Sequence, residues 1–312
     1  ANLNGRTALI WAAANGHTAC AQLLLDAKAD IHAANQNGST ALIFAASDGH
    51  TACAQLLLDA KADITVVNQY GNTALIFAAQ DGHTACVQVL LDAKADITVS
   101  NDNGDTALIL AAEGGHTACG QMLLDAKADI NAADQDGDTA LIVAALNGQT
   151  AYAELLLDAK ADITARNEDG NTALTSAASY GHTACVQVLV GAKADITTRN
   201  EDGNTVLALA AEGGHTACAE MLIEAKADIH ALNQYGSTAL IWAASYGHTA
   251  CAQMLLDANA NIFTGDNEDD NALILAALNG NTACVQMLLD AKADITAVNR
   301  CGNTALISAT SN

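Results

Sequence analysis

Cysteine is the residue of this chain best suited to nucleophilic or redox chemistry, and it recurs at a fixed spacing. Eight of the nine cysteines are separated by multiples of 33 residues: Cys20, Cys53, Cys86, Cys119, Cys185, Cys218, Cys251 and Cys284. Equivalent positions on stacked helices lie roughly 8–10 Å apart, beyond the reach of a disulfide. We therefore expect unpaired thiols that pack as small core residues, in a reducing and hence cytoplasmic compartment. Cys301 departs from the spacing and is expected to be exposed.

Histidine, the commonest metal ligand, follows the same spacing. The residues of this column are His17, His50, His83, His116, His182, His215 and His248. One imidazole per repeated unit cannot bring several ligands to about 2 Å from one ion, so the column predicts no metal site. Its fixed place after a glycine indicates a structural role at the turn that leads into the next segment.

Carboxylates offer one further candidate for metal chemistry. Residues 134–138, Asp-Gln-Asp-Gly-Asp, resemble the start of a calcium-binding loop. Their glycine comes two positions early, and Ala145 stands where the bidentate glutamate would be. Glycine-rich phosphate loops and the common serine-hydrolase and zinc-protease motifs are also missing. Since the reactive side chains recur rather than converge, the sequence predicts no enzyme activity, no cofactor and no metal.

The elements that position these residues repeat every 33 residues along the whole chain. A glycine marks the period at Gly5, Gly38, Gly71, Gly104, Gly137, Gly170, Gly203, Gly236 and Gly302, with Asp269 in the remaining place. Residues 1–312 are thus expected to form a single solenoid of nine complete repeats and a partial tenth.

Within a repeat, the pattern predicts two short helices and a loop. Thr40 can cap a helix over residues 41–47, and Gly49 can end it in the left-handed conformation. A second helix follows, roughly over residues 51–60, with Cys53 on its buried face. Neither helix is long enough to be stable alone, so the repeats must stack.

The repeated motif resembles the ankyrin repeat. The resemblance rests on the period, a Thr-x-Leu-x-x-Ala-Ala core, a Gly-His pair, a run of leucines and a following Ala-Asp-Ile. It implies an all-α solenoid of stacked helix-turn-helix repeats with β-hairpin-like loops, called fingers below. Two departures recur: the usual Thr-Pro-Leu-His becomes Thr-Ala-Leu-Ile, and lysine, as at Lys28, replaces the usual glycine before Ala-Asp.

Charge carries most of the functional information. The chain has 35 acidic and 12 basic residues, a net charge of -23. Thirteen acids lie on the fingers: Asp102, Asp105, Asp134, Asp136, Asp138, Glu168, Asp169, Glu201, Asp202, Asp266, Glu268, Asp269 and Asp270. Four more, Asp48, Asp81, Glu113 and Glu212, lie at the end of the first helix, and only Arg6, Arg166, Arg199 and Arg300 accompany these seventeen acids.

The resemblance implies that finger tips and first-helix ends together line a concave binding surface. An acidic surface repels nucleic acid and anionic membranes and attracts a basic protein, with salt-sensitive kinetics. No apolar stretch approaches the roughly 18 residues of a membrane span. We expect partner-binding residues at Tyr70, Asp102, Asp105, Glu113, Asp136, Asp138, Glu168, Asp169, Tyr180, Glu201, Asp202, Glu212, Tyr235 and Tyr246, the tyrosines as anchors. Trp11 and Trp242 are instead expected to pack between repeats.

Two segments and both chain ends depart from the pattern. Residues 259–271 lose several repeated residues and predict a distorted or mobile finger. Polar Thr175 and Ser176, with Gly191 nearby, predict the least stable part of the stack. The first repeat is as apolar as the interior ones, so self-association through uncapped ends is expected. End-to-end assembly into a fibre, a segment of a longer solenoid and a designed array therefore stand as alternatives.

Overall fold

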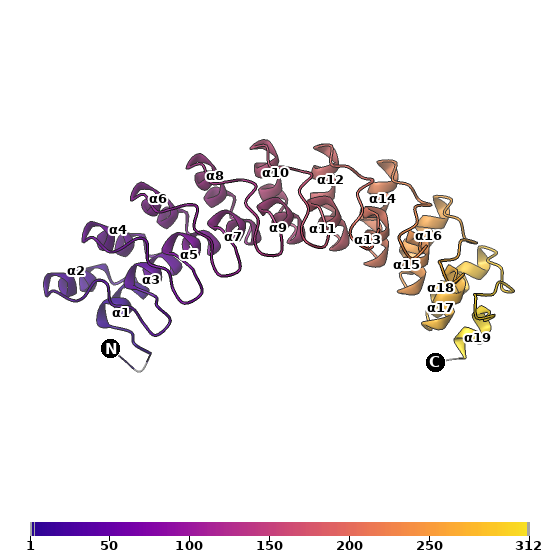
Figure 1. Ribbon diagram of the computed structural model, residues 1–312, viewed down its shortest axis with the longest axis horizontal. Helices are drawn as coiled ribbons and strands as arrows, with labels where there is room; N and C mark the ends of the chain where they lie inside the picture. Colours follow the sequence, from indigo (N-terminus) through magenta and orange to yellow (C-terminus); the bar gives the residue numbers. More distant parts are fainter. Residues whose placement is uncertain (1, 3, 311–312) are drawn as a thin grey trace. The chain divides into compact units, whose positions relative to one another are not determined.

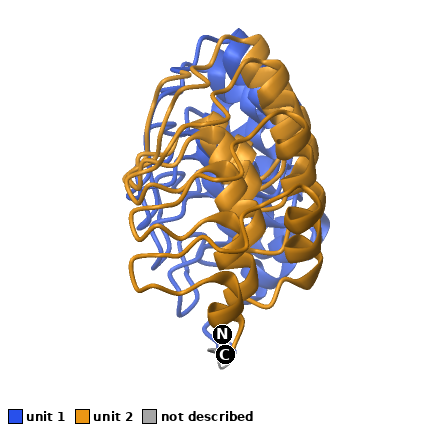
Figure 2. Ribbon diagram, turned by 90° about the vertical axis from the view of Figure 1, so that its right-hand side faces the viewer, with its two compact units in different colours: residues 1–144, 149–162 blue, residues 145–148, 163–312 orange. Residues whose placement is uncertain are grey.

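The computed structural model describes residue 2 and residues 4–310, which divide into two compact units. Unit 1 comprises residues 1–144 and 149–162, and unit 2 comprises residues 145–148 and 163–312 (Figure 2). Each repeat contributes a first helix of seven residues and a second helix of nine, labelled in Figure 1. The exception is the last repeat, in which only the five-residue α19 (Ala305–Ala309) is described. The fold is thus the expected all-α repeat solenoid.

The helix bounds repeat with the sequence. In unit 1 the first helices are α1 (Ala8–Ala14), α3 (Ala41–Ser47), α5 (Ala74–Gln80) and α7 (Ala107–Glu113), and the second helices are α2 (Thr18–Asp26), α4 (Thr51–Asp59), α6 (Thr84–Asp92), α8 (Thr117–Asp125) and α10 (Thr150–Asp158). In unit 2 the first helices are α11 (Ala173–Ser179), α13 (Val206–Glu212), α15 (Ala239–Ser245), α17 (Ala272–Leu278) and α19, and the second helices are α12 (Thr183–Gly191), α14 (Thr216–Glu224), α16 (Thr249–Asp257) and α18 (Thr282–Asp290). The unit boundary divides α9 (Ala140–Leu146).

A side-chain cap starts each first helix, as the threonine pattern predicts. Oγ1 of Thr73 accepts a hydrogen bond of 3.1 Å from the N–H of Ile76, which satisfies one of the free donors at the helix start. Where the sequence replaces threonine with Asn271, its Oδ1 accepts from the N–H of Ile274 at 2.9 Å. The substitution therefore keeps the cap.

Histidine links consecutive repeats. Nε2 of His83 lies 2.9 Å from the carbonyl oxygen of Ser47, at the end of the preceding first helix. Gly49 lies against the His83 ring at φ 74, and a Cβ on it would come within 2.7 Å of that ring. The same contact joins His215 to Ser179 at 3.0 Å in unit 2. The expected structural role is confirmed, but the bond runs between repeats rather than within one turn.

Small residues fill the core between the two rows of helices. Leu42, Ala45 and Ala46 of α3 are buried, and so is Cys53 of α4. The expectation that all eight periodic cysteines are buried is wrong for Cys20, which is exposed. The reason is the stacking direction, because α2 covers Cys53 and no described helix covers the same face of α2.

Each second helix ends in backbone strain. The residue two places after it is lysine at eight positions, from Lys28 to Lys292, and its φ lies between 64 and 74. This is the left-handed region that glycine tolerates best. The recurring replacement of glycine by lysine therefore places a strained residue at the end of every such helix.

The fingers are held by single β-bridges rather than strands. In the described residues, five isolated antiparallel bridges occur at their bases, such as Ala34 with Thr40 and Arg199 with Thr205. Within residues 4–310, none of the helices combines the length and the apolar character that crossing a membrane requires.

The two segments expected to be irregular keep the repeated hydrogen bonds. In the finger of residues 259–271, the N–H of Asp266 donates to the carbonyl of Asp270 at 3.0 Å, as Asn68 does to Asn72. The departure is Asp269, which takes φ 59 in place of glycine. In α11, Thr175 completes a capping box with Thr172. The mobility of the finger and the lower stability near α11 stay predictions.

Candidate protein-binding surface

The finger tips project to one side of each unit, and the helices lie on the other (Figure 2). An asparagine or aspartate shapes each tip: Oδ1 of Asn68 accepts from the N–H groups of Tyr70 and Asn72, both at 3.0 Å. Such side-chain bonds to the following backbone favour a tight turn. Polar residues after the turn are thereby presented to solvent.

Hydrogen bonds between tips arrange these residues in rows. The N–H of Asp102 donates to the carbonyl of Tyr70 at 3.0 Å, and the N–H of Gln135 to that of Asn103 at 2.9 Å. A Cβ on Gly71 would lie 2.8 Å from the backbone nitrogen of Asp102, so this approach requires glycine. The rows bring neighbouring tips together within a unit, as the acidic-surface hypothesis requires.

In unit 1 these rows place two expected site residues, Tyr70 and Asp102, next to each other. Tyr70 is 54% exposed, and Asp102 is exposed beside it. Asp105 is half-buried and accepts a hydrogen bond from Nδ2 of Asn101 at 3.1 Å. Asp136 is exposed and Asp138 half-buried in the next finger. Glu113, at the end of α7, is exposed, and its carbonyl accepts from Gln149 at 3.0 Å.

Among the finger acids of unit 1, Asp134 has a raised pKa. Burial raises the pKa of Asp134, its bonds from Asp138 and Asp136 lower it, and the Asp105 and Asp136 carboxylates raise it. Other fingers carry asparagine at this position, as at Asn233. The charged form of Asp134 is therefore disfavoured, and no cation in the finger compensates it. The turn that resembled a calcium loop has Oδ1 of Asp134 bonded to backbone N–H groups.

In unit 2 the geometry gathers finger and helix-end residues into one cluster. Oδ1 of Asp202 accepts from the hydroxyl of Tyr235 at 3.2 Å and from Nε2 of Gln234 at 3.1 Å. Burial raises the pKa of Glu212, at the end of α13, and the Asp202 carboxylate raises it further. The two acids are thus close enough to repel each other, and the exposed Tyr235 donates a hydrogen bond to one of them, Asp202.

An aromatic stack lies beside these acids. Trp242 of α15 stacks on Tyr246 with ring centroids 5.9 Å apart, and Tyr246 stacks on His248 at 6.3 Å. Nε2 of His248 lies 2.8 Å from the Glu212 carbonyl oxygen, which ties the stack to the acidic helix end. We call Asp202, Glu212, Tyr235, Trp242 and Tyr246 the unit 2 patch.

Trp242 lies in the unit 2 patch, but the sequence did not place it among the candidate site residues. Its side chain is half-buried, and its buried Nε1 has no hydrogen-bond partner among the described residues. The pattern assigned it to packing because phenylalanine occupies equivalent positions. The sequence signal that could have identified it is Tyr246, four residues later, because side chains four residues apart on a helix lie next to each other.

The remaining expected site residues of unit 2 are not part of the patch as defined, although Glu201 directly precedes Asp202 on the same finger tip. Tyr180 is 60% exposed and stacks on His182 at 6.5 Å. Glu168, Asp169 and Glu201 are exposed on two tips of unit 2, joined by a 3.0 Å bond from the N–H of Glu201 to the Asp169 carbonyl.

The arginines near the fingers are mostly engaged with groups other than these acids. Nη1 of Arg166 donates to the carbonyls of Gly170 and Arg199, both at 2.7 Å. Arg199 binds two carbonyls in the same way. Arg6 lies over the rings of Trp11 and Phe44, 5.1 and 4.4 Å from their centroids. Arg300 pairs with Asp269 at 3.5 Å.

Across residues 4–310, no group of three or more histidine, cysteine or acidic side chains is placed to hold a metal ion. The groups that the candidate surface offers to a partner are the carboxylates and aromatic rings described above. Such groups can bind lysine and arginine side chains through charge and through cation–π contacts.

Models of ankyrin repeats match almost the whole sequence. A model of three ankyrin repeats matches overlapping segments over residues 1–200 and again over 189–266, and a second model, of many copies, matches residues 273–312. No curated protein matches the sequence.

Solved structures are similar to the chain over about two thirds of its length. The crystal structure of the human ASB11 ankyrin repeat domain has a TM-score of 0.65 and 26% identity, and the match covers 70% of this chain and 98% of that one. The ankyrin repeat domain of Bcl-3, described as a unique member of the IkappaB protein family, has a TM-score of 0.58 and 28% identity, covering 66% and 94%.

Proposed function

The chain belongs to the ankyrin-repeat family, and from this premise we propose that it binds a basic protein through its acidic finger tips and helix ends. Ankyrin-repeat domains are in general protein-interaction scaffolds and are typically not enzymes. The basic character of the partner, the concave form of the surface and the cytoplasmic location are parts of the proposal.

The unit 2 patch is the observation that carries the proposal. Burial raises the pKa of Glu212, and repulsion by the Asp202 carboxylate raises it further. A lysine or arginine placed between them would relieve this repulsion. Tyr235 and Tyr246, 52% and 55% exposed, add rings on which a guanidinium can lie. The contact of Arg6 with Trp11 and Phe44 shows this chemistry within the chain itself.

A capture experiment tests the proposal. The wild-type chain and a variant with Asp136, Asp138, Asp169 and Asp202 changed to asparagine are used to retain proteins from a lysate at increasing salt. A matched control changes Asp59, Asp92, Asp125 and Asp257, which are exposed at the ends of second helices, to asparagine. We expect the first variant to lose the salt-sensitive partner and the control to keep it. Equal capture by all three chains would overturn the acidic-surface proposal.

End-to-end assembly is a second candidate, because apolar side chains are exposed in the first and last repeats. Leu23 of α2 is 69% exposed, and Leu306 of α19 is 72% exposed. Light scattering and electron microscopy separate the two functions. Rods of indefinite length support assembly, and a monodisperse monomer supports the binding scaffold.

A further inference from the structure

An arginine of the chain itself shows how the first helices of unit 1 can hold a cation. The guanidinium carbon of Arg6 lies 5.1 Å from the centroid of the Trp11 ring and 4.4 Å from that of the Phe44 ring. Trp11 belongs to α1 and Phe44 to α3, so one side chain contacts rings of two consecutive first helices. A planar guanidinium can stack on such rings, and the contact is attractive.

The next repeat has the rings without the arginine. Phe77 of α5 follows Phe44 by 33 residues, as Phe44 follows Trp11, and Ser39 stands in the place of Arg6. The helices α1, α3 and α5 have the same length and the same threonine cap, so we expect the second pair of rings to lie as the first pair does. Both phenylalanine rings are half-buried, and no cation of the described residues lies over Phe77.

Two carboxylates accompany this pair of rings. Each ring is followed four residues later by an exposed acid, Asp48 after the first and Asp81 after the second. Side chains at this spacing are neighbours, as the stacked rings at the same two positions of α15 demonstrate. Oδ2 of Asp81 accepts a hydrogen bond of 3.4 Å from Oγ of Ser47, so this carboxylate reaches the end of α3. No ion pair of the described residues involves either acid.

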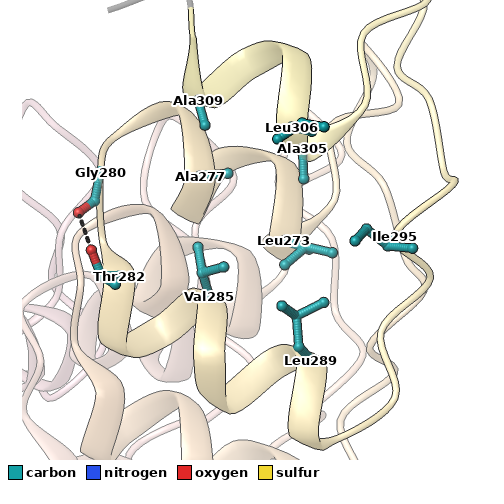
Figure 3. Close-up of a pocket in the computed structure, with 10 residues that line it drawn as sticks. All are labelled: Leu273, Ala277, Gly280, Thr282, Val285, Leu289, Ile295, Ala305, Leu306 and Ala309. Atoms are coloured by element: carbon teal, nitrogen blue, oxygen red, sulfur yellow. Dashed lines mark hydrogen bonds between the residues drawn. The ribbon is translucent and has the colours of Figure 1, made fainter.

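The pocket of unit 2 drawn in Figure 3 lacks these groups. Its lining residues, among them Leu273 and Leu306, carry neither a charge nor an aromatic ring. The hydroxyl of Thr282 is already bonded to the carbonyl of Gly280 at 3.4 Å. A cation therefore finds attractive partners at the pair of rings in unit 1 and none of them in this pocket.

We propose that Phe44, Phe77, Asp48 and Asp81 form a site for one arginine side chain of a basic protein. The guanidinium lies over both rings, as Arg6 lies over its own pair, and donates hydrogen bonds to Asp81. The two carboxylates outweigh the positive charge of Arg6. Arginine is preferred to lysine because a planar guanidinium stacks on rings and pairs with a carboxylate through two hydrogen bonds. The site rests on the proposed function for the kind of partner, but it uses no residue of the unit 2 patch.

Fluorine NMR tests the site, because only two of the three phenylalanines of the chain belong to it. The full chain is labelled with 4-fluorophenylalanine and titrated with an acetylated and amidated peptide, Gly-Ser-Gly-Arg-Gly-Ser-Gly. We expect the Phe44 and Phe77 signals to shift together, with a Kd on the order of 1 mM, while the exposed Phe263 does not respond. The same peptide with lysine should bind at least about threefold more weakly. No shift at Phe44 and Phe77, or equal binding of the two peptides, overturns the proposal.

Variants of the chain locate the arginine. Ser39→Arg supplies a guanidinium from the chain itself, so both signals should shift without peptide, and the peptide should bind at least about fivefold more weakly. Ala52→Arg adds the same charge to the exposed face of α4 and should have neither effect. If thermal melting shows that Ser39→Arg disturbs the fold, Phe77→Leu decides, since leucine occupies the equivalent position at Leu110. The Kd measured from the Phe44 signal should then rise at least about threefold, and an unchanged Kd overturns the proposal.

This experiment and the capture experiment fail separately, because the capture variant changes none of the residues of the site. Capture that depends on the finger acids, without shifts at Phe44 and Phe77, keeps the proposed function and removes the arginine site. Shifts at both signals with capture that ignores the finger acids support the site and remove the acidic-surface proposal.

Discussion

At the scale of single residues, the side chain at the start of the finger turn decides whether the finger donates a hydrogen bond to the preceding finger. In two fingers of unit 2, Nδ2 of the turn asparagine donates to a residue of the preceding finger: Asn233 to Asn204 and Asn299 to Asp270, both at 2.8 Å. Asp134 occupies this position beside Asp105 and can donate nothing when charged. The sequence therefore replaces a hydrogen bond with a repulsion between carboxylates.

Asp134→Asn should stabilise unit 1 at pH 7 by about 0.5 to 1 kcal/mol, because solvent screens the repulsion and the new hydrogen bond is modest. The pKa of Asp134 is raised in the folded chain, so its charge opposes folding at neutral pH. As the pH falls through the folded pKa towards the ordinary value of 3.8, Asp134 becomes neutral and the advantage of asparagine shrinks. Urea unfolding at about pH 7 and about pH 3 measures this. Asp102→Asn, at an exposed tip, is the control, and an equal gain there would contradict the explanation.

At the scale of helices, the left-handed residue after each second helix lowers the free energy of unfolding. Lys127, at φ 72, follows α8 in the left-handed conformation. Lys127→Gly should raise the free energy of unfolding by about 0.5 to 1 kcal/mol, because glycine adopts this conformation without a Cβ clash. Lys127→Ala removes the same charge and keeps the Cβ. It should give no such gain in denaturant unfolding, so a gain shared by both variants would assign the effect to charge.

Two helical glycines should respond in opposite ways to alanine. A Cβ on Gly191, at the end of α12, meets nothing within 4 Å, so Gly191→Ala should stabilise the chain by about 0.5 to 1 kcal/mol. A Cβ on Gly120 of α8 would lie 2.5 Å from the hydroxyl of Tyr152, a fully buried side chain. Gly120→Ala should therefore destabilise it, and thermal melting of both variants provides the comparison. If Gly191→Ala destabilises the chain, Gly191 does not lower the stability near α12.

The sequence predicts the helices well and the contacts between repeats only in part. The bounds of α3 match the expectation at both ends, because a capping threonine and a left-handed glycine are local signals. The exposure of Cys20 and the bond from His83 to Ser47 depend on which face the preceding repeat covers, which one repeat does not encode. The patch was found only in part for the same reason. Its acids and tyrosines stand out as variable residues, whereas the stacking of Trp242 on Tyr246 requires the helix geometry.

At the scale of the whole molecule, net charge sets the conditions under which a partner is met. A net charge of -23 attracts basic proteins broadly, and salt weakens this attraction. Specific binding through the unit 2 patch must therefore be separated from general attraction. Neutralising two carboxylates of the patch in one variant, and two carboxylates elsewhere in another, gives two chains of equal net charge.

The most direct measurement is the Kd of the salt-sensitive partner for three chains, by calorimetry at about 50 mM and about 300 mM NaCl. The chains are the wild type, the patch variant Asp202→Asn with Glu212→Gln, and the control Glu224→Gln with Asp257→Asn, whose acids are exposed at the ends of α14 and α16. We predict that the patch variant binds at least about tenfold more weakly and loses part of the salt dependence, while the control stays within about twofold of wild type. Equal weakening of both variants, or of neither, would contradict the account.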